Sequence, residues 1–301
     1  MIDSPSLARQ GAVHSVVEAL RLRLWARMRP RLSRLVYANG GLGDELMLTA
    51  IARAARAAGR PLHILTSQSG VWQGNSDPLS VQEGIERWFY ARTRGWVTTE
   101  IVHLSYQSGN GQHIAAQMAA KAGVALPLGW RPVLPLPSGT QRPRRRLVLQ
   151  NSCRGARYRA DTKEWPQDRW QELTRRLGRD FELVQVGVSA DPVLPGVRDS
   201  RGRTTLFEVA SLIANATAFV GLESGLMHVA AAMHTPAVII YGGRTRPHET
   251  GYGFNRNLTR APACAGCALN TGCPHQMICM QIPVDEVEGA VHEVAARGDP
   301  A

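Results

Sequence analysis

The segment at residues 39–44 has the sequence NGGLGD and lies between a short apolar run and an alanine-rich stretch. Glycines let a backbone approach a ligand closely, and the amides at a helix start favour negative charge. The spacing departs from the G-x-G-x-x-G fingerprint, which argues against a dinucleotide site. Asp44 is the chemically capable residue here. It is the N-cap of the following helix, a carboxylate at the mouth of a parallel sheet, where ligands bind, or both at once.

A second turn, at residues 221–228, has the sequence GLESGLMH and again separates an apolar run from a helical pattern. Ser224 and Gly225, with the free amides of the helix start, are suited to hold a phosphate group. Glu223 is placed to accept hydrogen bonds from ribose hydroxyls. His228 follows one turn later, and it is either part of this site or a structural histidine with its hydrogen bonds satisfied.

Basic residues gather upstream of this turn, at Arg154, Arg157, Arg159 and Lys163. Facing the start of a helix, such cations would neutralise a diphosphate leaving group. The alternative is a solvated basic surface. Gly242, in a glycine pair after the next apolar run, is expected to line the same crevice.

Four cysteines cluster near the C-terminus with the spacing C-x2-C-x5-C-x5-C, at Cys264, Cys267, Cys273 and Cys279. In an intracellular chain such thiols are reduced or metal-bound more often than disulfide-linked. The spacing leaves two interpretations open, a structural zinc or iron site and a loop of free thiols. Neither makes the cysteines catalytic.

The 301-residue chain has 35 Lys plus Arg against 24 Asp plus Glu, which gives a formal net charge of +11. This excess favours an anionic partner, although a high GC content of the gene would enrich arginine in the same way without any functional meaning. Binding to nucleic acid through a zinc module is the alternative from a different functional class. Few aromatic residues are interleaved with the basic ones, and recognised groove-reading motifs are lacking, so we do not expect a nucleic-acid partner.

Short apolar runs alternate with helical stretches from residue 35 onward, which predicts an α/β fold with parallel sheets. In the first half we expect strands at 35–38, 62–65 and 101–104 and helices at 45–58 and 113–122. A proline-rich, basic segment at 127–146 reads as a linker. The second half repeats the pattern, with strands at 147–150, 183–186, 219–221 and 238–241 and helices at 165–177, at 206–214 and from about 225. The length suits two domains, 35–140 and 141–301.

Residues 1–34 carry seven arginines interleaved with apolar residues at helical spacing. This pattern predicts a basic amphipathic helix, which either lies on an anionic inner-membrane surface or packs on its own domain. The arginines interrupt every candidate secretory signal, and no run is long enough to span a membrane. We therefore expect a cytoplasmic protein, with peripheral contact to the inner membrane as an option.

Taken together, these motifs resemble the bacterial heptosyltransferases of glycosyltransferase family 9. The resemblance rests on five stretches in their order along the chain, namely residues 41–44, 163–166 with Trp170, 223–228, 241–243 and 264–280. It covers roughly residues 35–295. It implies a GT-B fold, in which two Rossmann-like domains face each other across a cleft, with the acceptor in the N-terminal domain and the nucleotide-sugar donor in the C-terminal one.

The resemblance also implies an activity, namely transfer of heptose from ADP-heptose with inversion and without a catalytic metal or other cofactor. Asp44 would then be the general base, and Gly41 and Gly43 would form the acceptor-side loop. The implied donor-binding residues are Arg157, Lys163, Glu223, Ser224, Gly225, Leu226, His228 and Gly242. In the autotransporter heptosyltransferases of this kind, clustered cysteines hold an iron, which is what the four cysteines here resemble.

Glu223 departs from the family pattern, because that position is usually aspartate, and its carboxylate therefore reaches one methylene further. The identity of the transferred sugar therefore stays open. The leading hypothesis is a heptosyltransferase with an anionic or lipid-linked glycan acceptor such as the lipopolysaccharide core. The alternative is a related transferase that uses another nucleotide-sugar on a protein or a small molecule.

Overall fold

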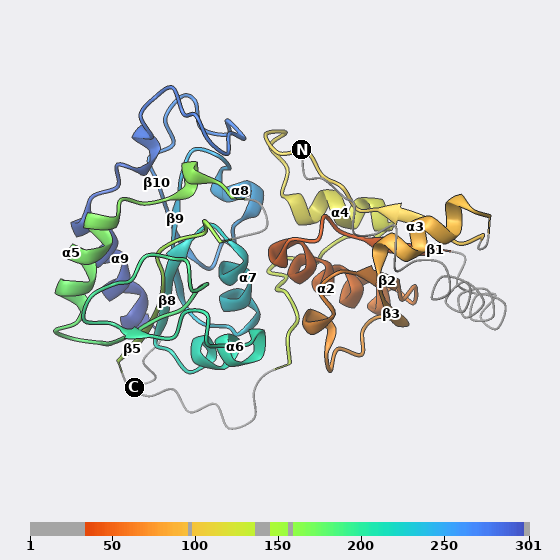
Figure 1. Cartoon of the computed structure of the whole chain (residues 1–301), viewed down its shortest axis with the longest axis horizontal. Helices are drawn as coiled ribbons and strands as arrows, with labels where there is room; N and C mark the ends of the chain where they lie inside the picture. Colours follow the sequence, from red (N-terminus) through yellow and green to blue (C-terminus); the bar gives the residue numbers. More distant parts are fainter. Residues whose placement is uncertain (1–33, 96–97, 136–144, 156–158, 298–301) are drawn as a thin grey trace, which may run out of the picture.

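The fold consists of two parallel β-sheets that lie side by side, each covered by helices (Figure 1). The computed structural model describes residues 34–95, 98–135, 145–155 and 159–297. Within that part of the chain, each sheet is built from one contiguous half of the sequence.

The first sheet has the strand order β3-β2-β1-β4, and all its strand pairs are parallel. Its strands are β1 (Arg34–Tyr37), β2 (His63–Thr66), β3 (Ser80–Glu83) and β4 (Glu100–His103). Within this sheet the chain passes from β1 to one side through β2 and β3, and returns to the other side as β4. The loops after β1 and β4 therefore leave the same edge at a point where the strand order reverses, which is where open α/β sheets bind ligands.

The second sheet repeats this arrangement in the order β10-β9-β8-β5-β6-β7, again with parallel pairing. Its strands are β5 (Arg146–Gln150), β6 (Glu182–Gln185), β7 (Arg198–Asp199), β8 (Ala218–Leu222), β9 (Ala237–Tyr241) and β10 (Arg256–Thr259). Here the strand order reverses between β5 and β8. A second ligand-binding edge is thus formed where these two strands end.

Helices cover both sheets. They are α2 (Leu42–Ala57), α3 (Ile85–Thr93), α4 (Ile114–Ala122), α5 (Gln167–Leu177), α6 (Leu206–Ala214), α7 (Gly225–Ala232), α8 (Pro247–Thr250) and α9 (Val284–Arg297), with short 3-10 turns η1 (Ser69–Trp72), η2 (Asp161–Lys163) and η3 (Ile278–Met280). Figure 1 shows α2 and α4 on the side of the first sheet that faces α7 and α8 of the second. Helices α5 and α9 pack on the outer side of the second sheet.

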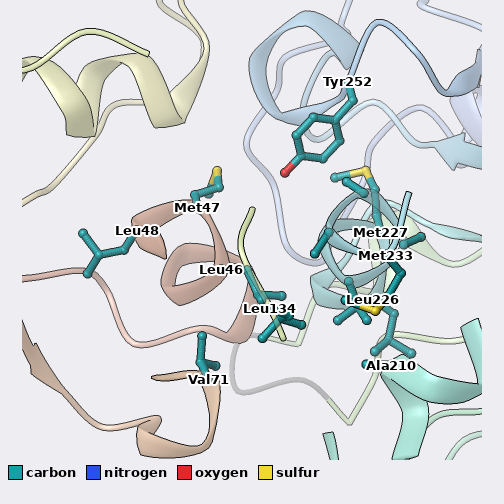
Figure 2. Packing of buried hydrophobic residues seen from close by; sticks show 14 of the residues in the cluster. Leu46, Met47, Leu48, Val71, Leu134, Ala210, Leu226, Met227, Met233 and Tyr252 are labelled. Atoms are coloured by element: carbon teal, nitrogen blue, oxygen red, sulfur yellow. The ribbon is translucent and has the colours of Figure 1, made fainter. Parts of the chain in front are cut away.

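One hydrophobic core runs across the junction between the halves, and it joins α2 to α7 (Figure 2). Leu46 and Met47 of α2 belong to the same cluster as Leu226 and Met227 of α7. Successive strand residues point to opposite faces of a sheet. Accordingly, Val148 joins this shared core, whereas its neighbours in β5 pack against α5 and α9. The two halves are therefore held together by packed apolar side chains.

The predicted α/β class is confirmed, and most predicted elements lie within three residues of the observed ones. The predicted helix at 206–214 has the observed bounds of α6. The predicted domain boundary at 140/141 lies outside the described residues, as does the predicted N-terminal helix apart from Arg34, the first residue of β1. No helix of the described residues is long and apolar enough to cross a membrane.

Part of the segment predicted as a linker packs against α2. The backbone N–H of Val133 donates to the Thr49 hydroxyl at 2.7 Å, and Leu134 is buried in the shared core (Figure 2). Residues 136–144 of the same segment are not among those described.

The starts of α2 and α7 meet at two glycines. A Cβ on Gly43 would lie 2.9 Å from Cδ2 of His228, and one on Gly225 would lie 3.0 Å from Cδ2 of Leu42. The first distance is shorter than real Cβ contacts, and the second is tighter than most of them, so a hydrogen in place of a methyl group permits the close approach. The helix starts, and the loops that precede them, are thereby brought to one place.

Replacing Gly43 with alanine is expected to destabilise the protein by about 1–3 kcal/mol, because the new methyl group must displace the buried His228 ring. Gly289→Ala is the matched control. This glycine lies inside α9 with open space around its Cβ position, so alanine should stabilise the helix by about 0.5–1 kcal/mol. Thermal unfolding of both variants measures the difference. Equal stabilisation by both would mean that α2 and α7 are not in contact at Gly43.

Candidate active site

A cleft of about 800 Å³ opens where the ligand-binding edges of the two sheets face each other. Its walls come from both halves of the chain. The side chains that carry the argument below are Asp44, Tyr106, Lys163, Glu223, Ser224 and Thr245. A cleft of this size is large enough to enclose a nucleotide-sized ligand.

Asp44 lies in the first turn of α2 and points into this cleft. The interpretation of Asp44 as the N-cap is wrong, because α2 begins at Leu42 and its N-cap is Gly41. Asp44 is instead the third helical residue, and its side chain lies on the wall of the cleft.

The environment of Asp44 strengthens it as a base. Burial raises the pKa of the Asp44 carboxyl above its usual range, and the charge of Glu223 adds to the rise. Hydrogen bonds from Tyr106 and Gly41 and the charge of Lys163 act in the opposite direction. Because Glu223 and Lys163 belong to the second half, groups from both halves set the proton affinity of this carboxyl.

Lys163 and Glu223 form an ion pair inside the cleft, although they are 60 residues apart in the sequence. The Lys163 ammonium also donates to the backbone carbonyl of Glu223 at 3.3 Å. The hydroxyl of Thr245 donates to Oε2 of Glu223 at 3.1 Å. The predicted roles of Lys163 on phosphate and Glu223 on ribose stay predictions, and the structure adds that each side chain holds the other in place.

The start of α7 faces the same space. Ser224 is its N-cap, but the side chain makes no capping hydrogen bond. The Ser224 hydroxyl instead donates to Oε1 of Gln150 at 2.5 Å and so connects the ends of β8 and β5. The amides of the first turn, which includes Gly225 and Leu226, therefore receive no bond from the cap residue and remain suited to an anionic ligand.

His228 lines the deep end of the cleft and is only 4% exposed. Its Nδ1 lies 2.7 Å from the Tyr252 hydroxyl, and the other side of its ring faces Gly43. Burial lowers the pKa of His228 to about 3, and the charges of His113 and Lys163 add to the effect. The imidazole is therefore neutral at pH 7. Its contacts fit a group that packs the junction between the two halves.

Gly242 is not among the described residues that line the cleft. It lies behind η2, where a Cβ would collide with the carbonyl oxygen of Thr162, the residue before Lys163. Gly242 therefore allows the turn that carries Lys163 to approach the end of β9. This close approach was not foreseen from the sequence, which predicted that Gly242 would line the crevice itself.

The remaining basic residues of the predicted cluster lie near acidic partners. Arg159 pairs with Asp161 at 3.0 Å, and Arg154 lies 3.7 Å from the same carboxylate. Both arginine side chains are more than half exposed. Arg157 lies outside the described residues. Lys163 is thus the member of this cluster that the described structure brings into the cleft.

The four clustered cysteines are all free thiols, and so is the separate Cys153. Among the described residues, no three His, Cys, Asp or Glu side chains are grouped so that they could hold a metal ion. The donor arrangement does not fit a zinc or iron site. Burial raises the pKa of the Cys279 thiol, and nearby Cys273 and Cys264 contribute to the rise. The Cys279 thiol is therefore protonated and weakly nucleophilic at neutral pH.

Sequence reasoning missed Tyr106 and Thr245. Tyr106 follows β4 and Thr245 follows β9, so each lies after a strand that borders one of the two ligand-binding edges. The only available signal was this position at the carboxyl end of a parallel strand. It does not single out one residue within a loop.

Residues 142–272 match the model of glycosyltransferase family 9 (heptosyltransferase), which confirms the resemblance to this family for that region. Lipooligosaccharide heptosyltransferase 2 of Haemophilus influenzae is 34% identical over 112 residues, which cover 33% of this chain and 32% of the relative. Lipopolysaccharide heptosyltransferase 1 of Escherichia coli O18:K1:H7 is 28% identical over 141 residues, or 39% of each chain. The chain thus spans about a third of the length of these curated relatives.

Solved structures extend the likeness over both sheets. The dodecameric iron-containing glycosyltransferase TibC from enterotoxigenic E. coli superposes with a TM-score of 0.70 at 18% identity and covers 89% of this chain and 80% of that one. The E. coli ADP-heptose LPS heptosyltransferase II gives 0.63 at 17% identity and covers 88% and 99%. The GT-B fold predicted from the family 9 resemblance is confirmed.

Glu45, the residue after Asp44, carries a second carboxyl group to which the family 9 resemblance gives no role. Glu45 is fully buried in the first half, and its Oε2 accepts a hydrogen bond from the Trp72 indole N–H at 3.0 Å. Burial raises the pKa of Glu45 to about 7, and the neighbouring charge of Asp44 adds to the rise against the Trp72 donor. Folding therefore strengthens proton binding at this carboxyl.

The contribution of Glu45 to stability should depend on pH with a defined sign. It is fully present below the unfolded pKa of 4.5 and is lost as the pH rises through the folded value of about 7. The free energy of unfolding of the wild type, relative to Glu45→Gln, should fall across this window by up to about 3 kcal/mol. Urea unfolding from pH 4.5 to 8 measures it, with exposed Glu86→Gln as the control. Parallel curves for wild type and Glu45→Gln would contradict the raised pKa.

Proposed function

We propose that the chain is an inverting glycosyltransferase that transfers heptose from ADP-heptose to a hydroxyl group of a glycan. The observation that carries the proposal is the meeting of Asp44, from the first sheet, with Lys163 and the start of α7, from the second, in one cleft. A base on one side and an anion-binding surface on the other are the two requirements of glycosyl transfer from a nucleotide-sugar.

The second half is the proposed donor side. Lys163 and the uncapped amides at the start of α7 would contact the diphosphate, since a cation and a helix N-terminus both favour negative charge. Glu223 would release Lys163 in part as the phosphates bind, and its carboxylate would then accept hydroxyl groups of the donor. Two similar solved structures support the choice of nucleotide, namely E. coli heptosyltransferase WaaC with ADP and TibC in complex with ADP-D-beta-D-heptose.

The proposed reaction proceeds in one displacement. Asp44 removes the proton from the acceptor hydroxyl while the acceptor oxygen forms a bond to the anomeric carbon. The bond from that carbon to the diphosphate oxygen breaks, and ADP leaves with the electron pair. Lys163 and the α7 amides stabilise the charge that develops on the diphosphate. Attack opposite the leaving group inverts the configuration at the anomeric carbon.

The relatives support a glycan of the lipopolysaccharide core as the acceptor class, because their names describe lipooligosaccharide and lipopolysaccharide heptosyltransferases. The acceptor would enter beside Asp44, along the wall that the loop at Gly41 and Gly43 and the turn η1 contribute. The chain spans only about a third of the length of these relatives, so acceptor and activity both belong to the proposal.

Asp44→Asn should lower kcat for heptose transfer by at least about 10²-fold, because the amide cannot accept the proton. The affinity for ADP should change little, since Asp44 belongs to the acceptor side. A coupled assay of ADP release measures turnover, and calorimetric titration measures the affinity. Asp77→Asn, at a surface ion pair with Arg53, is the control with the same chemical change. Full transfer activity in Asp44→Asn would remove Asp44 from the mechanism.

Lys163→Ala should instead weaken ADP binding by about 10-fold to 150-fold, as expected for the loss of a charge-assisted hydrogen bond to phosphate. Calorimetric titration with ADP measures the change. The control is Arg175→Ala, which removes an exposed cation from α5 on the outer side of the second sheet. An unchanged affinity in Lys163→Ala would place the diphosphate elsewhere.

A further inference from the structure

A second cation, Arg244, lines the cleft on the proposed donor side. Arg244 lies in the loop between β9 and α8. The hydroxyl of the next residue, Thr245, donates to Glu223, which is the ion-pair partner of Lys163. Arg244 is therefore one residue away from the group of side chains that holds Lys163, and the family 9 resemblance gives it no role.

The two cations differ in what neutralises them. Lys163 is paired with the Glu223 carboxylate, so the pair adds no net charge to the cleft. Arg244 forms no ion pair with a carboxylate of the described residues, and its Nε donates at 2.7 Å to Oδ1 of Asn270, which is a neutral amide. Its two terminal nitrogens have no hydrogen-bond partner in the described part of the chain. They form a planar fork that matches two oxygens of a phosphate group.

Asn270 belongs to the cysteine-rich segment, which is hydrogen-bonded along the loop that carries Arg244. The backbone N–H groups of residues 266–267 donate to the Gly243 carbonyl at 2.7 and 3.1 Å. The backbone N–H of Ala268 donates to the Arg244 carbonyl at 3.0 Å. The same segment thus fixes the backbone of Arg244 and, through Asn270, one side of its guanidinium group.

This segment also holds the turn η2, which carries Lys163. The Thr162 hydroxyl donates to the Leu269 carbonyl at 2.5 Å, and the Thr162 N–H donates to the Asn270 carbonyl at 3.3 Å. Turn η2 follows β5, whereas Arg244 follows β9. One short stretch of the cysteine-rich segment therefore connects two turns that each bring a cation into the cleft. These bonds are made by backbone groups, by Asn270 and by Thr162, and none of them uses a cysteine side chain.

We propose that Arg244 binds the diphosphate of the donor together with Lys163, and that Asn270 is the positioning residue for Arg244. A nucleoside diphosphate carries more negative charge than one lysine that is already paired with Glu223 can balance. Arg244 supplies the missing charge, and its fork fixes the orientation of the phosphate oxygens. This inference rests on the proposed function in so far as the cleft binds a nucleoside diphosphate.

Arg244→Ala should weaken ADP binding by about 10-fold to 100-fold, because two charge-assisted hydrogen bonds to phosphate are lost. The affinity for adenosine should change little, since adenosine has no phosphate. Arg244→Lys keeps the charge and loses the fork, so its ADP affinity should lie between those of the wild type and Arg244→Ala. Calorimetric titration measures the affinity for ADP, and ligand-observed NMR titration measures that for adenosine.

Arg260→Ala is the matched control, because it removes the same charge from the same half of the chain. Arg260 pairs with Glu286 at 2.6 Å and is not among the residues that line the cleft. Its replacement should leave ADP binding nearly unchanged. Equal losses of ADP affinity in Arg244→Ala and Arg260→Ala would reduce the effect to net charge and overturn the inference. Wild-type ADP affinity in folded Arg244→Ala, or equal losses for ADP and adenosine, would overturn it as well.

The wild type tests the proposed function separately from the variants. Preference of the wild type for GDP or UDP over ADP would overturn the choice of donor. Arg244→Ala would then be titrated with the preferred nucleotide, which carries the same diphosphate, and a selective loss of its affinity would still support the inference. Absence of binding to every nucleoside diphosphate would overturn both the proposed donor site and the inference.

Asn270→Ala tests the positioning role. It removes the oxygen that accepts from Nε of Arg244 and keeps the backbone carbonyl that accepts from Thr162. The affinity for ADP should fall by less than in Arg244→Ala, and the affinity for adenosine should stay unchanged. The double variant should match Arg244→Ala alone, because Asn270 acts only through the guanidinium group. Additive losses in the double variant would overturn the role assigned to Asn270.

Discussion

The close contact between the starts of α2 and α7 is the constraint on which the site depends. At this point Gly43 meets the ring of His228, and Gly225 meets Leu42, with little room for a methyl group on either glycine. Helix α2 follows β1 and helix α7 follows β8, and each of these strands ends at the ligand-binding edge of its own sheet. Bringing the two helix starts together therefore brings the two edges together. The cleft exists because both edges open into the same space.

The charges in the cleft follow from this arrangement. Asp44 and Glu223 are buried carboxylates from opposite halves, and Lys163 lies where it lowers the proton affinity of the first while it pairs with the second. A buried charge is costly without a partner, and the second half supplies the cation that acts on Asp44 of the first. A negatively charged donor would compete with Glu223 for Lys163. Under the proposed function, donor binding on one side of the cleft would therefore change the proton affinity of Asp44 on the other.

The sequence predicted the parallel α/β architecture because runs such as those of β5, β8 and β9 are almost wholly apolar, as strands buried on both faces must be. It gave no sign of β3 or of the two-residue β7, which are short and polar. Within the site, the glycine turns and Asp44 were recognisable from local spacing. The ion pair of Lys163 with Glu223 joins residues that only tertiary packing brings together.

The central claim is that the second half binds an adenine nucleotide-sugar so that its diphosphate faces Asp44. The most direct measurement is a calorimetric titration of the purified chain with ADP, ADP-heptose, GDP and UDP under the same conditions. Selective binding of ADP and ADP-heptose, with GDP and UDP much weaker, is the result that this account predicts. Preferential binding of GDP or UDP would contradict the choice of donor, and the absence of binding by all four would contradict the assignment of the cleft as a donor site.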